Sequence, residues 1–380
     1  MYGKRVNIPF NKPLVLGSEN SFIEKVFEAN QFSGNGEFSK KCNIILKEKT
    51  GCKKAIVTSS CTDALEMTAL LANIKAGDEV IMPSFTFVTT ASAFELRKAS
   101  IVWCDIRPDT KNIDETKIGS LITPKTKAVV VVHYAGVACE MDMISEICKE
   151  NNLILIEDTA QGIDSYYKGK PLGSFGDLAT ISFHETKNIQ CGEGGALLIN
   201  NPDFVQRAEF IRDKGTNRTL FNKGIVDKYT WVELGSSFLM SELQAGFLYP
   251  QLSESENVNR NRLQSWNKYY SELSKFISAE KLPVIPENCR HNAHIFYMIC
   301  KDFEERSRLI NFLKDNGVAA IFHYVPLHKA PYWNGKYDDL ELKNTELIAQ
   351  TLVRLPMFYG LKEEEINFVC SKIEEFYKGL

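Results

Sequence analysis

Between residues 50 and 200 the chain alternates short apolar runs with amphipathic segments, and this alternation constrains the fold more than any other feature. Several apolar runs are uninterrupted and β-branched, which is typical of strands buried on both faces of a sheet. Strands that alternate with helices predict an α/β domain with a mostly parallel sheet. The predicted strands lie at 55–58, 79–82, 100–103, 128–132, 153–156, 179–182 and 196–199, with amphipathic helices at 63–73 and 141–150.

A second, smaller domain of α+β type is expected after this region. Residues 212–237 are polar and aromatic and are interpreted as a long loop, and a long charged helix is predicted at 240–276. Strand-like segments at 293–300 and 319–323, a helix at 304–315 and terminal helices follow. We therefore divide the chain into a large domain at 1–250 and a small domain at 251–380, and the N-terminal segment is a candidate to pack on the small domain.

Composition and charge exclude several classes of protein. The net charge of -3 gives no reason to expect nucleic acid or an anionic membrane as a partner. No apolar run approaches the roughly 20 residues that a membrane helix needs. The first residues lack the apolar stretch of a signal peptide, so we expect a cytoplasmic protein.

The ten cysteines are scattered and form no Cys-x-x-Cys pair. This scatter favours free thiols over disulfides or a zinc site. His291 and His294 have a spacing that could chelate a metal, but no third ligand lies near them in the sequence. We therefore predict no metal site.

Two residues at the ends of predicted strands suggest a specific chemistry. Asp158 ends one apolar run and Lys187 follows another, and parallel sheets bind ligands at the carboxyl ends of their strands. A lysine can form a Schiff base with pyridoxal phosphate while a carboxylate pairs with its pyridine nitrogen. Asp158 is also compatible with a helix cap, and Lys187 with a surface turn. The glycine-rich segment 192–195 close to Lys187 favours the functional interpretation.

Two further segments could complete a cofactor site. Residues 58–65 follow a predicted strand, contain small hydroxyl side chains and open a helix, which suits a phosphate, although ordinary helix caps look the same. Phe85 and Phe87 follow the next strand and share a face if the segment is extended. An aromatic ring there could stack on a flat cofactor, but a core position is the simpler reading of each phenylalanine.

Together these motifs resemble the DegT/DnrJ/EryC1/StrS sugar-nucleotide aminotransferases. Ser182-Phe-His-x-x-Lys187 with Gly-Glu-Gly-Gly resembles the Schiff-base motif of that family. The segments 60–62, 77–80, 83–87 and 157–161 match its order and spacing, and the resemblance runs from about residue 7 to the C-terminus. It implies the fold type I of pyridoxal-phosphate enzymes and a homodimer with active sites shared between subunits.

The resemblance also implies roles for individual residues. Lys187 would be the Schiff-base lysine and proton shuttle, and Asp158 the partner of the pyridine nitrogen. Gln161 would lie near the ring and Phe87 would stack on it. The cofactor phosphate would be surrounded by Cys61, Thr62 and Ser182.

One segment departs from the family pattern. Where much of the family has an asparagine that reaches the partner subunit's phosphate, this chain has Ser237, and Leu239 replaces an arginine. A serine hydroxyl could make the same contact with shorter reach. We therefore expect Ser237 to contribute to the cofactor site of the partner subunit.

The segments 214–218, 226–231 and 235–237, together with 184–187, resemble one branch of the family. Its enzyme makes dTDP-4-amino-4,6-dideoxygalactose from dTDP-4-keto-6-deoxyglucose for enterobacterial common antigen or related lipopolysaccharide-type glycans. The resemblance implies glutamate as amino donor. Amination of another keto sugar nucleotide, at C3 or C4, stays open as an alternative.

Basic residues should receive the substrate's diphosphate. Lys214, Arg218 and Lys228 of the predicted loop are candidates, although a solvated loop explains them equally well. His323 is placed in the small domain to approach the sugar, and a structural role is nearly as plausible.

The sequence disfavours three functions other than amino transfer. Related dehydratases carry histidine where this chain has Lys187, so the lysine favours amino transfer over dehydration. A catalytically inactive sensor that binds sugar nucleotide is disfavoured by the intact Lys187 and Asp158. A dehydrogenase is disfavoured because no Gly-x-Gly-x-x-Gly follows the first predicted strand.

Overall fold

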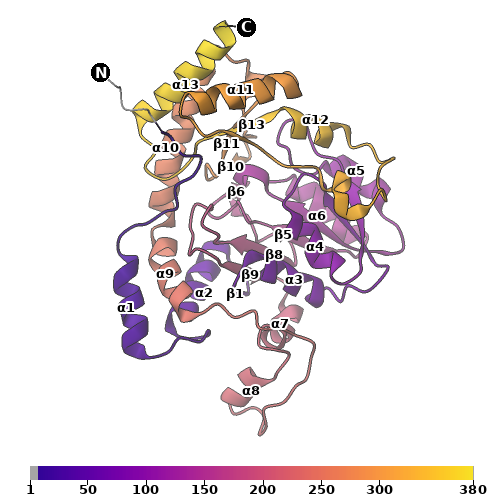
Figure 1. Cartoon of the computed structure of the whole chain (residues 1–380). Helices are drawn as coiled ribbons and strands as arrows, with labels where there is room; N and C mark the ends of the chain where they lie inside the picture. The colour runs from indigo at the N-terminus through magenta and orange to yellow at the C-terminus, as the bar shows by residue number, and fades with distance from the viewer. Residues whose placement is uncertain (1–6, 380) are drawn as a thin grey trace.

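The computed structural model describes residues 7–379, and its large domain is built on a seven-stranded sheet (Figure 1). The strand order is β1-β9-β8-β5-β4-β2-β3. β9 pairs antiparallel with β1 and β8, and the other neighbouring strands are parallel. The mostly parallel sheet predicted from the sequence is therefore confirmed. The strands are β1 (Lys54–Thr58), β2 (Glu79–Pro83), β3 (Ser100–Cys104), β4 (Thr126–Val132), β5 (Ile154–Asp158), β8 (Leu178–Ser182) and β9 (Gly195–Ile199).

Helices cover both faces of this sheet because successive strand residues point to opposite sides. Val80 and Met82 join one apolar cluster, whereas Ile81 between them joins another. The first cluster includes α3 (Cys61–Leu71), α4 (Val88–Glu95) and α7 (Val205–Ile211). The opposite face is covered by α2 (Glu37–Thr50), α5 (Glu115–Leu121), α6 (Met141–Glu150) and α9 (Glu242–Ser253), with α1 (Glu19–Ala29) packed on α9.

The single long helix predicted at 240–276 is wrong, because the structure has two helices there. α9 begins after Ser241, whose hydroxyl accepts from the Gln244 backbone, and α10 (Ser255–Leu273) follows after Glu254. Pro250 inside α9 has no backbone N–H, so it interrupts the hydrogen-bond ladder just before this junction. At Glu254 the backbone leaves helical geometry, with φ -99° and ψ 7°.

The segment predicted as a loop at 212–237 contains a short helix, α8 (Arg218–Asn222). Figure 1 shows α8 and its flanking chain projecting from the body of the large domain, below α7. The projecting segment is held at its base by Asp213 pairing with Ser237 and by Thr216 pairing with Trp231. Residues 213–237 are therefore an ordered projection, called the arm below, and not a structureless loop.

The small domain packs helices on a three-stranded sheet of order β11-β13-β12. Its strands are β11 (Phe296–Ile299), β12 (Ile321–Phe322) and β13 (Leu352–Leu355), and its helices are α10, α11 (Phe303–Asp315), α12 (Lys343–Thr351) and α13 (Glu363–Lys378). The predicted terminal helices are present as α12 and α13, and β13, which the sequence did not indicate, lies between them. The two predicted strands of this domain are also shorter than expected.

The N-terminal segment packs on this domain, since the Ile8 N–H donates to the Gly317 carbonyl at 2.9 Å. The apolar cores of the two domains meet along α10. Val258 packs with the large-domain cluster and Trp266 with the small-domain cluster. The division at 250/251 stays a prediction.

Minor elements complete the described chain. A second small sheet combines β6 (Tyr166–Tyr167), β7 (Lys170–Pro171) and β10 (Cys289–Arg290). Single 3-10 turns lie at Tyr134–Gly136, Pro202–Phe204, Ala279–Lys281, Leu327–Lys329 and Pro331–Trp333. None of the helices within residues 7–379 is long and apolar enough to cross a membrane.

Candidate active site

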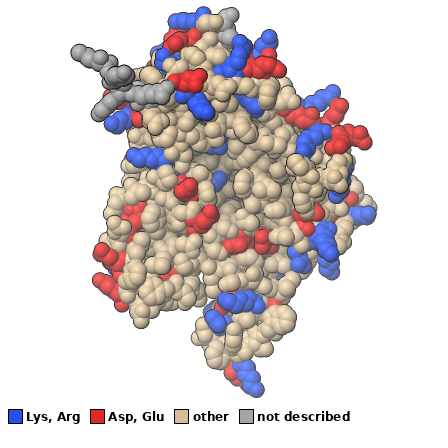
Figure 2. All heavy atoms as spheres, viewed as in Figure 1, with Lys and Arg blue, Asp and Glu red and all other residues tan. Residues whose placement is uncertain are grey.

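A pocket of about 730 Å³ opens where the carboxyl ends of the central strands face the small domain. Figure 2 shows a hollow near the centre of the visible surface, with Lys or Arg atoms inside it. The large domain contributes the end of β5, the turn after β8 and the start of α3, and the small domain contributes residues around β12 and β13. The predicted residues that line it are Cys61, Thr62, Phe87, Asp158, Gln161, Ser182, Lys187 and His323.

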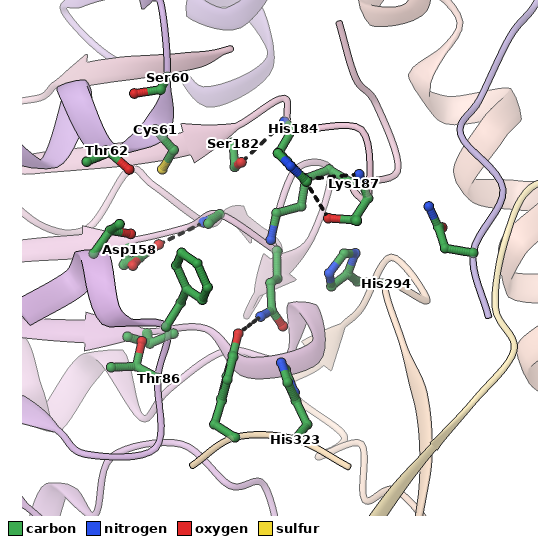
Figure 3. A pocket seen from close by; sticks show the side chains of 18 of the residues that line it. Ser60, Cys61, Thr62, Thr86, Asp158, Ser182, His184, Lys187, His294 and His323 are labelled. Atoms are coloured by element: carbon green, nitrogen blue, oxygen red, sulfur yellow. Dashed lines mark hydrogen bonds between the residues drawn. The ribbon is translucent and has the colours of Figure 1, made fainter. Parts of the chain in front are cut away.

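Lys187 lies in the turn that joins β8 to β9. Its backbone N–H donates to the His184 carbonyl at 2.8 Å, which fixes the turn, and Figure 3 shows its amine directed into the pocket. Burial lowers the pKa of Lys187, and the nearby Arg354 adds to this effect, whereas Cys61 and Asp158 oppose it. A lysine held in this way is more readily available as a neutral nucleophile than an exposed one.

Asp158 ends β5 and faces the pocket from the side opposite Lys187 (Figure 3). Its carboxylate accepts hydrogen bonds from the Thr90 hydroxyl at 2.7 Å and from the Ala160 N–H at 3.1 Å. The side chain is only 5% exposed. Because a buried carboxylate is stabilised by a cationic partner, this arrangement suits a protonated ring nitrogen.

The neighbouring carboxylate, Glu157, points to the other side of the sheet and has a structural role. It accepts from His133 Nε2 at 3.0 Å and from the backbone N–H groups of Gly173, Phe175 and Gly176. Burial alone would raise the pKa of Glu157, but these hydrogen bonds lower it overall. Alternation along β5 therefore separates two adjacent acids into one structural and one pocket-facing residue.

The start of α3 forms one end of the pocket. The Ser60 hydroxyl caps the helix by accepting from the Asp63 N–H at 3.0 Å, and Cys61 and Thr62 occupy its first turn beside Ser182 (Figure 3). Gly195 of β9 packs directly against this turn, since a Cβ at position 195 would lie 2.4 Å from the Cys61 nitrogen. Backbone N–H groups at a helix N-terminus, together with hydroxyls, form a binding site for phosphate.

Gln161 and two aromatic residues border the middle of the pocket. The side-chain Oε1 of Gln161 accepts from the Ala135 N–H at 2.7 Å, and its side-chain Nε2 donates to the Tyr324 hydroxyl at 3.0 Å. Phe87 lines the pocket with 57% of its surface exposed, whereas Phe85 is buried. Of the two phenylalanines considered from the sequence, only Phe87 is therefore accessible to a flat ligand.

Two histidines of the small domain reach the pocket. His323 Nδ1 and the Tyr134 hydroxyl are 3.0 Å apart, and burial lowers the pKa of His323 well below its usual value. His294 Nδ1 lies 2.9 Å from the Asn188 side-chain oxygen, and burial likewise lowers the pKa of His294 well below its usual value. The sequence predicts His323 near the sugar. It offers His294 only as a possible metal ligand, and no local pattern in the sequence places His294 in the pocket.

The remaining predicted residues lie outside this pocket. Lys214 and Arg218 are on the arm and approach Asp213 at 3.0 and 3.7 Å. Lys228 is exposed on the same arm, and Ser237 is exposed at its base. The structure of one chain therefore does not bring these four residues to Lys187.

The pocket's polar groups match three of the polar parts of pyridoxal phosphate, namely the aldehyde, the ring nitrogen and the phosphate. Lys187 can bond to the aldehyde, Asp158 can accept from the ring nitrogen, and the start of α3 with Ser182 can hold the phosphate. Gly195 has no side chain and lies close to the start of α3, so backbone atoms form this part of the phosphate end of the pocket. The residues present therefore fit the cofactor. Among residues 7–379, no cluster of His, Cys, Asp and Glu side chains has the arrangement of a metal site.

Comparison with known proteins decides the family. A model of the DegT/DnrJ/EryC1/StrS aminotransferase family matches residues 17–374. The chain belongs to this family. Its members use pyridoxal phosphate, so the chain is a pyridoxal-phosphate enzyme of fold type I, as the sequence predicted.

Several relatives extend over nearly the whole chain. A pleiotropic regulatory protein of Geobacillus stearothermophilus is 32% identical and covers 94% of this chain and 93% of its own. GDP-perosamine synthase of Escherichia coli O157:H7 is 28% identical and covers 97% and 98%. The crystal structure of the aminotransferase TlmJ from Streptoalloteichus hindustanus is 26% identical, with a TM-score of 0.89 and coverage of 98% and 99%.

Proposed function

We propose that the protein transfers an amino group from glutamate to C4 of dTDP-4-keto-6-deoxyglucose, forming dTDP-4-amino-4,6-dideoxygalactose for a surface glycan. The observation that carries the proposal is Lys187 facing Asp158 across a pocket whose end at the start of α3 suits a phosphate. GDP-perosamine synthase, a relative over 97% of this chain, supports a nucleotide-linked sugar as substrate. The branch-like segments at 214–218 and 226–231 support the particular sugar.

The residues of the pocket would have two kinds of role, proton transfer and positioning of the cofactor. When bound, pyridoxal phosphate supplies the carbon that exchanges the amine and a ring that takes up electrons. Lys187 would act as the general base that takes the proton from the donor's Cα. Asp158 would keep the ring nitrogen protonated, and the start of α3 would hold the phosphate. In transfer to the keto sugar, Lys187 would deliver the proton to C4 of the sugar.

The proposal includes a homodimer in which the arm of one subunit reaches the site of the other. Ser237 would then meet the partner's cofactor phosphate, and Lys214, Arg218 and Lys228 would approach the diphosphate of the partner's substrate. The exposed apolar side chains of the arm support a buried position in an assembly, and none of these four residues lines the pocket of its own chain.

The direct test is Lys187→Ala in the full-length protein. We expect loss of the visible absorbance that depends on the lysine–cofactor bond and a fall in amino transfer of more than about a thousandfold, because Lys187 would be both the residue bonded to the cofactor and the general base. Lys314→Ala, at an exposed lysine of α11, is the matched control and should keep both signals. Full activity in Lys187→Ala would refute the proposal.

The choice of sugar needs its own experiment, because another keto sugar nucleotide is the main alternative. The purified enzyme should be assayed with a panel of 3-keto and 4-keto sugars on dTDP, UDP and GDP, and the product's configuration determined by NMR. The proposal predicts the highest kcat/KM for dTDP-4-keto-6-deoxyglucose and an axial amine at C4. A yellow protein that glutamate does not bleach would instead indicate a sensor, and a dehydrated product would indicate a dehydratase.

A further inference from the structure

His294 is a buried histidine of the pocket to which the proposed mechanism gives no role. It lies just before β11 in the small domain, and its side chain lines the pocket together with Lys187. Only 5% of the residue is exposed. Figure 3 shows the imidazole close to Lys187, and the lysine is near enough to affect the charge of the ring. The hydrogen bonds of His294 determine what this ring offers to the pocket.

The backbone of His294 is tied to both domains. Its N–H donates to the Asn292 side-chain oxygen at 3.1 Å, and its carbonyl accepts from Arg262 of α10 at 2.7 Å. The side-chain nitrogen of Asn292 in turn donates to the backbone carbonyls of Gln161 and Ile163 at 2.9 and 2.8 Å. His294 is therefore held in place against the wall of the pocket that the large domain forms.

Asn188, the residue after Lys187, has one possible orientation of its side-chain amide. Its Nδ2 donates to the backbone carbonyl of Asn292 at 2.9 Å and to Oδ1 of Asn259 at 2.8 Å. A backbone carbonyl only accepts hydrogen bonds, so the amide nitrogen must face it. Asn259 is fixed in the same way, because its own Nδ2 donates to the Asp164 carboxylate at 3.2 Å. The side-chain oxygen of Asn188 is therefore left free for another partner.

That partner is His294, and the contact determines which ring nitrogen carries the proton. The Asn188 oxygen lies 2.9 Å from His294 Nδ1, and because this oxygen only accepts, Nδ1 must donate. Burial lowers the pKa of His294 well below its usual value, and the nearby Lys187 and Arg262 lower it further, which favours the neutral ring. Nε2 then carries a free lone pair, and it has no hydrogen-bond partner among residues 7–379.

The Lys187 amine is the donor best placed to use this acceptor. It also lacks a hydrogen-bond partner within the described chain, and it lines the same pocket. The ring of His294 is anchored on Asn188, the residue after Lys187, so the acceptor keeps its position relative to the lysine. A ligand that enters the pocket has no such fixed relation to His294.

A lysine that takes up a proton inside a pocket needs an acceptor of this kind. Lys187 becomes an ammonium when it removes the proton from the donor's Cα, and a buried cation without hydrogen bonds is costly. In the proposed function Asp158 is the partner of the ring nitrogen. Burial raises the pKa of the Cys61 thiol to about 12, which leaves it a neutral and weak acceptor. A neutral imidazole supports the ammonium without a negative charge that would make the proton difficult to release.

We propose that His294 Nε2 accepts a hydrogen bond from Lys187 while the lysine holds the proton, and so directs the amine toward the carbon that receives it. This inference rests on the proposed amino transfer. His294 is a positioning residue, because it acts through Lys187, and Asn188 positions His294 in turn. The proton moves only between carbon and the Lys187 nitrogen, and His294 stays neutral throughout.

Three variants of the holoenzyme separate the acceptor from the rest of the side chain. His294→Asn keeps a donor for Asn188 but has no acceptor at the place of Nε2. His294→Gln is longer, and its amide oxygen can reach that place. His291→Asn is the matched control, since His291 is a buried histidine of the same segment that lies outside the pocket, and asparagine can still accept from the Ala293 N–H.

Bleaching of the cofactor by L-glutamate is measured in single turnovers, with hydrogen or deuterium at Cα. We expect His294→Asn to lower the maximal rate at least about tenfold, because the lysine loses one hydrogen bond while it is charged. The glutamate concentration at half-maximal rate should stay unchanged, and the deuterium isotope effect should rise because proton transfer becomes slower than the other steps. His294→Gln should recover most of the rate, and His291→Asn should behave like the wild type.

Labelling of Lys187 in the apo-protein supplies a readout that needs no turnover. The lysine reacts with fluorodinitrobenzene when it is neutral, and an acceptor stabilises its charged form. Loss of the acceptor in His294→Asn should therefore move the labelling midpoint to lower pH, whereas His294→Gln should stay near the wild type. Cys61, Asp158 and Arg354, which also shift the pKa of Lys187, are unchanged in both variants.

The wild-type protein tests the tautomer without any substitution. Nitrogen-15 NMR of histidine-labelled protein should show a neutral His294 with its proton on Nδ1. A proton on Nε2 would overturn the inference, and so would an unchanged rate in His294→Asn, an equal loss in His294→Gln, weaker glutamate binding as the sole defect, or a labelling midpoint that does not move down. Failure of the proposed function would appear differently, since glutamate would not bleach the wild-type enzyme while the midpoint of His294→Asn would still move.

Discussion

At the residue scale, two effects act in opposite directions on the charge of Lys187. It must be neutral to act as nucleophile and base, yet it lies in a pocket that also contains Asp158. Burial has a larger effect than the attraction to Asp158 and lowers the pKa of the lysine, and Arg354 lowers it further. The pocket therefore makes the neutral amine of Lys187 easier to form than that of an exposed lysine.

This balance predicts the pH dependence of Lys187 in the apo-protein. A lowered pKa means that the neutral amine forms at lower pH than in an ordinary lysine, whose pKa is about 10.4. Labelling of Lys187 by fluorodinitrobenzene, followed by mass spectrometry across pH, should have its midpoint below that value. Arg354→Gln removes a repelling cation and should move the midpoint upward. A midpoint that stays in place or moves down would contradict the electrostatic account.

Sequence reasoning reached some residues of the pocket and missed others for a physical reason. Lys187 and Asp158 stand directly after apolar runs, so their place at the sheet edge follows from local pattern. Arg354 and His294 belong to the small domain, and nothing near them in the sequence indicates that they face Lys187. Only packing of β13 and β11 against the large domain brings them there.

At the scale of elements, the contact between β9 and α3 shapes the proposed phosphate site. Gly195 begins β9 and pairs with Thr58 of β1 and Ser182 of β8. A Cβ there would lie 2.4 Å from Cys61 N and 2.5 Å from Ser60 C, which are backbone atoms that cannot move aside cheaply. Because Gly195 has no Cβ, the N-terminus of α3 can lie directly against the start of β9.

Gly195→Ala should therefore displace the start of α3. We expect a loss of about 1–3 kcal/mol in unfolding free energy and at least a tenfold weaker affinity for pyridoxal phosphate, measured by thermal melts and by titration of the apo-protein. Gly119→Ala in α5 is the control, because a Cβ there meets nothing within 4 Å and helices favour alanine. Unchanged cofactor affinity in Gly195→Ala would show that the close contact does not shape the site.

Element boundaries were predicted least well where tertiary contacts override local pattern. The apolar spacing of 240–276 is compatible with one helix, but Pro250 and the turn at Glu254 split it. β13 is four residues long and lies between two helices, so its apolar residues resemble a helix end. Its identity as a strand depends on pairing with β11 and β12, which come from elsewhere in the chain.

At the scale of the whole molecule, the exposed apolar surface of the arm is not explained by contacts within a single subunit of the described chain. The arm projects from the large domain in Figure 1 and carries six exposed apolar side chains. These are Phe221, Ile225, Tyr229, Trp231, Val232 and Leu234. Apolar side chains gathered on a projecting segment are typical of a protein interface.

The proposed dimer predicts that a charge on the arm separates the subunits. Trp231 is 75% exposed, so Trp231→Asp should leave the fold of the chain intact while shifting the protein from dimer toward monomer and reducing activity. Sedimentation velocity and circular dichroism would check this. Leu347→Asp, at a residue of α12 that is 56% exposed, is the control. A wild-type protein that is monomeric and fully active would disprove the shared site.

The sequence by itself determined the α/β class, the strand ends that carry Asp158 and Lys187, and the cofactor chemistry, because these depend on local periodicity and on residues adjacent to a strand. The tertiary structure decided which side chains share the pocket. It separated Glu157 from Asp158 by strand alternation, left the arm's cations outside the pocket of their own chain, and placed Arg354 in the same pocket as Lys187. Such contacts join segments far apart in the chain, so no local pattern encodes them.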